Sequence, residues 1–411
     1  MAQYEQVYHA LMNNNDVKQM LSSINADDKN TLDEQITIAQ IPAPPFSEHE
    51  RADYIKKCLE ELGLLDVRKD EEGNVYGRRK GAGNGPTLFV SAHIDSVFSK
   101  DTDTTVSEKD GIYYGPGITD DARGLAALLT IVRAFQQSAI ETTGDIIFGG
   151  TVGEEGPGDL RGVKAFFKDN RDIDGFISID AVSPTEIIYN GTGSFRYIVT
   201  YKGPGGHSFG AFGTPSAVHA AARATVKLAD LEPSTDPKTT FNVGVFEGGT
   251  IPTAIAEEAK LAIDLRSNGE PELDSIEQTM FRFLQEAADE ENRKWAFSSE
   301  EGVGYTIEQI GDRPVGSQSS STEIVETAWY ATEALALAPS LAPPASTDSN
   351  YPMSIGVPSI TLGAGGQAGG AHTLLEWYRP EKGYLGPQRV LLTILGLVGT
   401  VGNSPTLRKR T

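Results

Sequence analysis

The chain has 411 residues, with 35 lysines and arginines against 57 aspartates and glutamates, a formal net charge of −22. This acidity argues against nucleic acid as a partner, because phosphate binding needs a basic surface. The length indicates about two or three domains, and an apolar content of 39 % excludes a disordered chain. Composition alone leaves open whether the carboxylates only solubilise the surface or also hold metal ions.

The N-terminal segment predicts three helices and a loop. Residues 3–23 and 28–40 favour two helices, and the proline-rich run that follows, IPAPPF, is expected to be an extended loop. A third helix is expected to begin at Ser47, which forms a capping-box pair with Glu50, and to end at Gly63.

Beyond this helix the chain alternates between short apolar strands and helices. Buried strands are expected in PTLFVSAHID, GDIIFGGTVGEE and DGFISIDA, and helices in ARGLAALLTIVRAFQQ and DLRGVKAFFKD. Fully apolar strands that alternate with helices are typical of a parallel sheet covered on both faces.

The pattern changes near Gly191. GSFRYIVTYKG alternates like a half-exposed strand, and Thr214-Pro215 opens a helix in the favoured order of cap and proline. Two further strands, in FNVGVFEGG and KLAIDLRS, precede the amphipathic helix PELDSIEQTMFRFLQEAADEENRKW. This order predicts a compact α+β insert.

From about Ser319 the earlier pattern returns, with a helix in STEIVETAWYATEALAL, a strand in PSITLG and a final apolar helix. We therefore predict one α/β domain built from residues 1–191 and 310–411 and interrupted by a smaller α+β domain over residues 192–309.

The chain also carries signals of its compartment. MAQYEQVYHALMNNN lacks the basic and apolar regions of a signal peptide, and no window approaches 18 uninterrupted apolar residues, so no membrane span is expected. Cys58 is the only cysteine, which forbids an intramolecular disulfide and is consistent with a reducing compartment. A cytoplasmic protein with no membrane partner is predicted.

Histidine and acidic residues fall where the predicted strands end. In open α/β sheets the ligand site lies outside the carboxyl ends of the strands, so these segments are expected to meet at one place. The residues are His93 and Asp95 after LFVSA, Glu154 and Glu155 after IIFGGTVG, Asp180 after FISI, His372 after SITLG and a glycine-rich loop, and Asp120 and Asp121 before a helix.

Each of these residues alone has an ordinary structural explanation. A single histidine is most often hydrogen-bonded in the fold, an Asp-Asp pair before a helix is usually an N-cap, and a Glu-Glu pair is usually solvated. Carboxylates packed together, however, would repel and raise one another's pKa unless cations neutralised them. Mixed histidine and carboxylate ligands suit zinc, cobalt or manganese better than calcium.

The motifs SAHIDS, GPGITDDARG, GEEG, SIDA and GGAHTLLEW, in order between about Ile41 and Arg379, also resemble a known family. They are similar to the co-catalytic zinc peptidases and aminoacylases that include peptidase T, bacterial carboxypeptidase G and succinyl-diaminopimelate desuccinylase. The resemblance implies a zinc-exopeptidase fold, a mixed and mostly parallel sheet sandwiched by helices, with an inserted lid and dimerisation domain. It implies two metal ions, one held by His93 and Asp180, one by Glu155 and His372, with Asp120 bridging both.

The same resemblance implies catalytic roles. Glu154 would be the general base, and Asp95 would hold the ring of His93. His207, in GPGGHSFG, would offer a donor to the tetrahedral intermediate, often across a dimer, and Arg266, in AIDLRS, would pair with a substrate carboxylate. The ordinary alternatives are a plain turn for His207 and an exposed strand arginine for Arg266.

Two positions bear on specificity. Aminopeptidases and dipeptidases of the family carry aspartate at Asp180, whereas carboxypeptidases and many deacylases carry glutamate, which favours an exopeptidase on short peptides. Thr253 departs from the family, since many relatives carry a substrate-binding asparagine there, and Asp348, in STDSN, matches a family loop without a derived role.

Three alternatives for function follow. The first is an exopeptidase acting as a homodimer through the inserted domain, and the second is an N-acyl-amino-acid deacylase. The third is a non-catalytic metal or peptide binder, which would need neither Glu154 nor Asp95.

Overall fold

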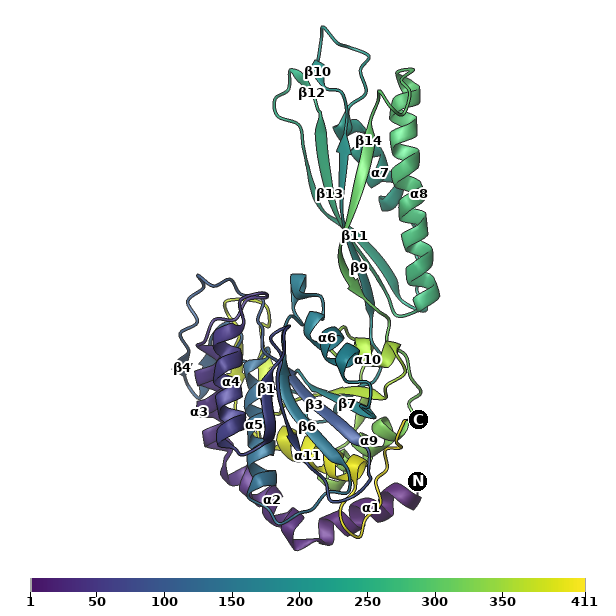
Figure 1. The fold of residues 1–411 in the computed structure, drawn as a ribbon. Coiled ribbons are helices and arrows are strands. Elements are labelled where there is room, and N and C mark those ends of the chain that lie inside the picture. The colour runs from purple at the N-terminus through teal and green to yellow at the C-terminus, as the bar shows by residue number, and fades with distance from the viewer. Residues whose placement is uncertain (1, 411) are drawn as a thin grey trace. The chain divides into compact units, whose positions relative to one another are not determined.

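The structure is a computed structural model and describes residues 2–410. The chain forms two units (Figure 1). The residues up to Gly191 and from Gly316 onward make the first unit, and Thr192–Val315 make the second. Within the described part of the chain, no helix combines the length and the apolar character needed to cross a membrane.

The first unit is built on an eight-stranded sheet. Its strands are β1 (Leu65–Lys69), β2 (Val75–Arg79), β3 (Thr87–His93), β6 (Asp145–Thr151), β7 (Gly175–Ile179), β8 (Glu186–Ile188), β15 (Ser340–Leu341) and β16 (Ser359–Leu362). The order is β1-β2-β6-β3-β7-β16-β8-β15. The pairs β6–β3, β3–β7, β7–β16 and β8–β15 are parallel, and the other three are antiparallel. The predicted mixed, mostly parallel sheet is confirmed.

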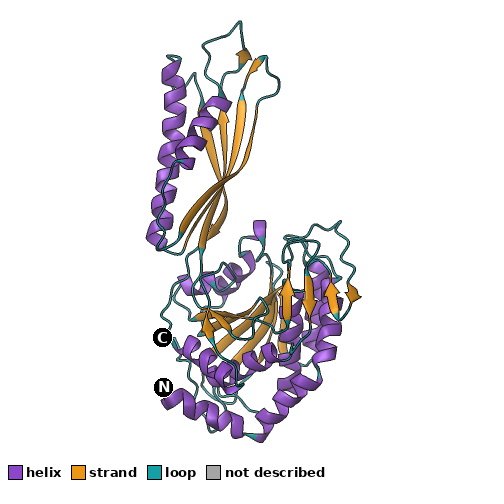
Figure 2. Cartoon of the chain, turned by 180° about the vertical axis from the view of Figure 1, so that it is seen from behind, coloured by secondary structure: helices purple, strands orange, loops and turns teal. Residues whose placement is uncertain are grey.

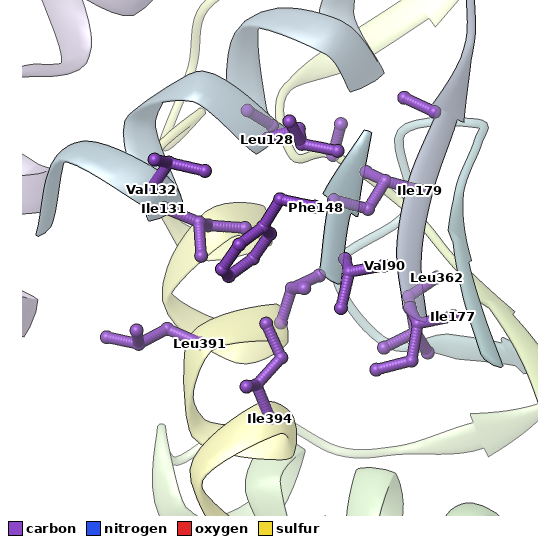
Figure 3. Packing of buried hydrophobic residues seen from close by; sticks show 14 of the residues in the cluster. Val90, Leu128, Ile131, Val132, Phe148, Ile177, Ile179, Leu362, Leu391 and Ile394 are labelled. Atoms are coloured by element: carbon purple, nitrogen blue, oxygen red, sulfur yellow. The ribbon is translucent and has the colours of Figure 1, made fainter. Parts of the chain in front are cut away.

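The central strands are buried on both faces, as their apolar runs predict. Along β3, Val90 faces the larger core, where Phe148 of β6 lies among side chains of α5 (Ala122–Gln136) and α11 (Leu385–Val398) (Figure 3). The alternate residue Phe89 faces the opposite side and stacks on Phe166 of α6 (Arg161–Asp169), with ring centroids 3.9 Å apart. Helices therefore cover both faces of the sheet.

The predicted helix over residues 3–23 is wrong, because the structure divides it into α1 (Ala2–Asn13) and α2 (Asn15–Ala26). Asn14 ends the first helix, and its side-chain oxygen accepts hydrogen bonds from the amides of Asp16 and Val17 at 2.8 and 3.2 Å. An asparagine N-cap satisfies amides that would otherwise lack partners, which explains the break. The next helix, α3 (Asp28–Ala39), lies within its predicted range.

The capping box predicted at Ser47 is also wrong. Helix α4 (His49–Glu61) begins two residues later, with Glu48 as N-cap and no capping hydrogen bond from its side chain. The Glu48 carboxylate instead pairs with Arg161 at 2.6 Å, and the Ser47 amide closes a turn with the carbonyl of Pro44. The proline-rich loop therefore continues up to the helix.

A second, small sheet of the first unit has no counterpart in the sequence predictions. Its strands are β4 (Ser107–Lys109), β5 (Ile112–Tyr114), β17 (Gln367–Gly369) and β18 (Trp377–Arg379), all antiparallel in the order β17-β18-β5-β4. Through the pairing of Trp377 with Tyr114, it joins the segment that precedes Asp120 to the segment that contains His372.

The second unit is a four-stranded antiparallel sheet with two helices on one face (Figure 2). The strands are β9 (Gly193–Lys202), β11 (Thr239–Gly248), β13 (Glu258–Ser267) and β14 (Gly304–Arg313), in the order β11-β13-β9-β14, and the helices are α7 (Ala217–Ala229) and α8 (Glu270–Lys294). A two-stranded ribbon of β10 (Gly206–His207) and β12 (Ala254–Ile255) completes the unit.

Candidate metal centre and active site

Five segments of the first unit converge where the parallel strands end. They supply His93, the last residue of β3; Glu154 and Glu155, shortly after β6; Asp180, directly after β7; Asp120, just before α5; and His372, between β17 and β18. Groups of these side chains place their nitrogen and oxygen atoms within 4.8 Å of one another.

Asp120 lies at the middle of this cluster. One carboxylate oxygen is 2.8 Å from Nε2 of His93, and the other is 2.8 Å from Nε2 of His372. The same nitrogen of His372 is 3.0 Å from Oε1 of Glu155. A single carboxylate therefore stands between two imidazole rings that come from opposite ends of the sequence.

The donor atoms form overlapping groups that could hold cations. His93, Asp120 and Asp180 make one group, and Asp120, Glu155 and His372 make another. Asp120 is the only member common to both of these groups. Mixed nitrogen and oxygen donors of this kind fit zinc and similar divalent ions, so the residues present fit a site for two cations.

The charges of the cluster show why cations would be favourable there. Burial and then the charge of Asp120 raise the pKa of Glu155 to about 7 and also raise that of Asp180. Burial opposes the ionisation of Asp120, but hydrogen bonds from His372 and His93 outweigh it and hold its pKa well below the usual range. The hydrogen bond between His372 and Asp120 in turn raises the pKa of His372 to about 9. Divalent ions would offset this crowding of negative charge.

Exposure differs sharply across the cluster. His93, Glu154 and Glu155 are buried, whereas 55 % of the His372 side chain is exposed. The centre therefore meets solvent beside His372, and the carboxylate of Glu154 lies on its buried side.

Asp95 orients two parts of the cluster at once. Its carboxylate oxygens accept hydrogen bonds from the amides of Glu154 and Glu155, at 2.9 and 2.8 Å. The Nδ1 atom of His93 lies 3.0 Å from the backbone oxygen of Asp95 and 3.7 Å from its carboxylate. Asp95 is fully buried, so it fixes the Glu154–Glu155 turn as well as the ring of His93.

Two further acidic residues surround the centre. Asp348, whose role the sequence left open, is buried and accepts a hydrogen bond of 2.5 Å from the hydroxyl of Thr151 at the end of β6. Glu376, to which the sequence assigned no role, is fully buried and accepts hydrogen bonds from the amides of Gly117, Thr119 and Asp120. Its sequence signal is its place in the motif GGAHTLLEW, four positions after His372.

The remaining predicted site residues belong to the second unit. His207 is exposed in β10, and its Nδ1 accepts hydrogen bonds from the amides of Phe209 and Gly210 at 3.2 and 3.1 Å. In a neutral ring that accepts at Nδ1, Nε2 carries the hydrogen and is free to donate. Arg266 pairs with Asp264 at 2.7 Å, and the carbonyl of Thr253 accepts a bond from Ser208.

Comparison with known proteins gives a family match. Residues 89–395 match the model of peptidase family M20/M25/M40. A deformylase of Bacillus subtilis, which acts on N-formyl-4-amino-5-aminomethyl-2-methylpyrimidine, is 29 % identical over 308 residues, 63 % of this chain and 70 % of the deformylase. The succinyl-diaminopimelate desuccinylase of Pseudoalteromonas atlantica is 30 % identical over 198 residues, 44 % of this chain and 52 % of that enzyme.

Solved structures share the fold over most of their length. A tripeptidase of Staphylococcus aureus matches with a TM-score of 0.74 and 24 % identity, covering 89 % of this chain and 97 % of its own. The aminopeptidase PepT of Bacillus cereus matches with a TM-score of 0.73 and 22 % identity, over 89 % and 98 %. The YxeP protein of Bacillus subtilis, a dinuclear metal-binding peptidase, has a TM-score of 0.65 and 15 % identity, over 90 % and 99 %.

Proposed function

The chain belongs to peptidase family M20/M25/M40, and from this premise we propose that it is a cytoplasmic di-zinc exopeptidase acting on short peptides. Membership makes it a metal-dependent hydrolase of amide bonds. The single observation that carries the finer proposal is the position of Asp120, whose two oxygens each lie 2.8 Å from a different histidine.

The two groups that share Asp120 would hold the two cations. His93 and Asp180 would complete one position, and Glu155 and His372 the other. Zinc suits this donor set best, with cobalt or manganese as alternatives. When bound, such a pair of ions supplies Lewis acidity, which lowers the pKa of a water molecule and stabilises negative charge on a carbonyl oxygen.

The protein's own residues would move the protons and orient the substrate. Glu154 would accept the proton of the attacking water and return it to the leaving amine, while Asp95 holds its backbone in place. His207 would donate from Nε2 to the oxyanion, and Arg266 would pair with a substrate carboxylate.

The preference for peptides rests on Asp180, because the related aminopeptidases and dipeptidases carry aspartate at this position. The second candidate, N-acyl-amino-acid deacylation, is favoured by the relatives of similar sequence, which include a deformylase and a desuccinylase. Both candidates use the same metals and the same base, so only the substrates distinguish them. The homodimer through the second unit stays a prediction; edge strand β11, which exposes Val245 and Phe246, offers a surface for it.

A peptide-library digestion read by mass spectrometry tests this proposal. Zinc- or cobalt-loaded protein is expected to remove single residues from one end of di- and tripeptides, with turnover that falls as the peptide lengthens. The Glu154→Gln protein serves as the control for contaminating peptidases. Hydrolysis of N-acetyl or N-succinyl amino acids without hydrolysis of any di- or tripeptide would contradict the proposal and favour the deacylase.

A further inference from the structure

Glu376 makes an unusually complete set of hydrogen bonds for a buried carboxylate. Its Oε1 accepts from the Thr119 amide at 2.7 Å, the Thr119 hydroxyl at 2.5 Å and the Asp120 amide at 3.1 Å, and its Oε2 accepts from the Gly117 amide at 3.0 Å. The side chain is fully buried. A buried carboxylate is tolerated only when its oxygens accept hydrogen bonds. Because residues 117–120 supply these bonds in one backbone conformation, Glu376 stabilises that conformation.

The main chain of Glu376 belongs to the loop that carries His372. Its amide donates to the carbonyl of Thr373 at 3.1 Å, and the Thr373 amide donates to the carbonyl of Gly370 at 3.1 Å. His372 lies inside the turn from Gly370 to Thr373 and adopts a φ of 64°, which is uncommon for residues other than glycine. These two turns therefore fix the backbone of His372 within the loop.

Glu376 thus connects the loop that carries His372 with the loop that carries Asp120. Its carbonyl also accepts from the Gly115 amide at 3.1 Å, which extends the pairing of β5 with β18 up to this residue. The side chain of Glu376 binds one loop and its main chain belongs to the other. Between these loops, Nε2 of His372 lies 2.8 Å from a carboxylate oxygen of Asp120.

We propose that Glu376 is a positioning residue of the metal centre: it fixes Asp120 against His372 and so sets the affinity for the cation held by Asp120, Glu155 and His372. The inference rests on the proposed di-metal function. Residues that orient metal ligands from behind typically change metal affinity by about 10- to 100-fold when replaced, and we expect an effect of this size.

The alternative role for Glu376 is general stability, and the chain offers a matched control. Asp174 is also a buried carboxylate, and it accepts from the amides of Thr87 and Arg410 at 2.7 and 2.5 Å. Thr87 begins β3 and His93 ends it. The contact of Asp174 with Thr87 is therefore separated from the metal centre by the length of the strand, about 20 Å. Asp174→Asn should lower the melting temperature without changing metal binding.

The test compares Glu376→Gln, Thr119→Val, Asp174→Asn and the wild-type protein. Zinc affinity is measured by competition with a chromophoric chelator, and ligand geometry by the visible absorption of the cobalt-loaded protein. In Glu376→Gln an NH2 group replaces one of the two acceptor oxygens and faces at least one backbone amide that needs an acceptor, so we expect one of the two zinc affinities to fall about 10- to 100-fold and the cobalt spectrum to change. Thr119→Val, which removes one donor, should shift both readouts less in the same direction.

The outcomes separate this inference from the function on which it rests. Wild-type zinc affinities and an unchanged cobalt spectrum in both Glu376→Gln and Thr119→Val would overturn the role of Glu376, while the metal centre would stand. If Glu376→Gln does not fold, unchanged metal binding by Thr119→Val overturns the role on its own. A wild-type protein that binds no zinc would overturn the metal centre itself.

Discussion

Replacing Glu154 by glutamine is expected to lower the turnover of short peptides by about 10²- to 10⁴-fold, because an amide cannot accept the proton of the attacking water. In activation free energy this corresponds to about 3–5 kcal/mol. Zinc content and melting temperature should stay close to those of the wild type. The reason is that the carboxylate of Asp95 holds the Glu154–Glu155 turn through the backbone amides of these two residues, which the substitution leaves in place.

The measurement is kcat for a tripeptide, with zinc content determined by mass spectrometry on the same sample. Asp174→Asn, the same chemical change at a buried carboxylate far from the centre, is the control and should keep wild-type turnover. Near-normal turnover by a Glu154→Gln protein that still holds its zinc would show that another residue is the base.

Replacing Asp120 by asparagine is expected to abolish tight binding at both cation positions. Asp120 is common to the two groups of donors and contacts both histidines, so the loss of one charge weakens both positions together. We expect less than one zinc ion per chain after dialysis and a loss of turnover of at least about 10³-fold, in line with the contribution of such ions to catalysis.

Zinc stoichiometry after dialysis checks this expectation, again with Asp174→Asn as the control for a lost buried carboxylate. An Asp120→Asn protein that retains two zinc ions at wild-type affinity would show that Asp120 does not bridge the two positions.

The local sequence pattern predicted the helices and strands that are buried along almost their whole length. The helix after Asp121 is apolar on nearly every side, and α5 follows the prediction within one residue. Strands β3, β6 and β7 each carry an apolar run and are buried along almost their whole length because both of their faces are covered, and this pattern also predicted their parallel arrangement. The site residues could be grouped because the ends of parallel strands meet at one edge.

Features that depend on distant partners could not be predicted. The strands of the small sheet are three residues long, which is too short for periodicity to mark them. Asp110-Gly111 marks the turn between β4 and β5, but the pairing of β5 with β18 joins segments more than 250 positions apart and has no local signal. Ser47 and Glu50 match a capping box, but the helix begins at His49 instead, and its N-cap, Glu48, binds Arg161, which lies far along the chain. The role of Glu376 likewise exists only through its contact with residues 117–120.

The most direct measurement of the central claim is a zinc titration of the chelator-stripped wild-type protein, followed by tripeptide hydrolysis. If Asp120 joins two cation positions in one active centre, hydrolysis is absent without metal and returns as zinc is added, reaching its maximum at about two ions per chain. Hydrolysis that persists in the metal-free protein, or that does not return when zinc binds, would contradict the claim.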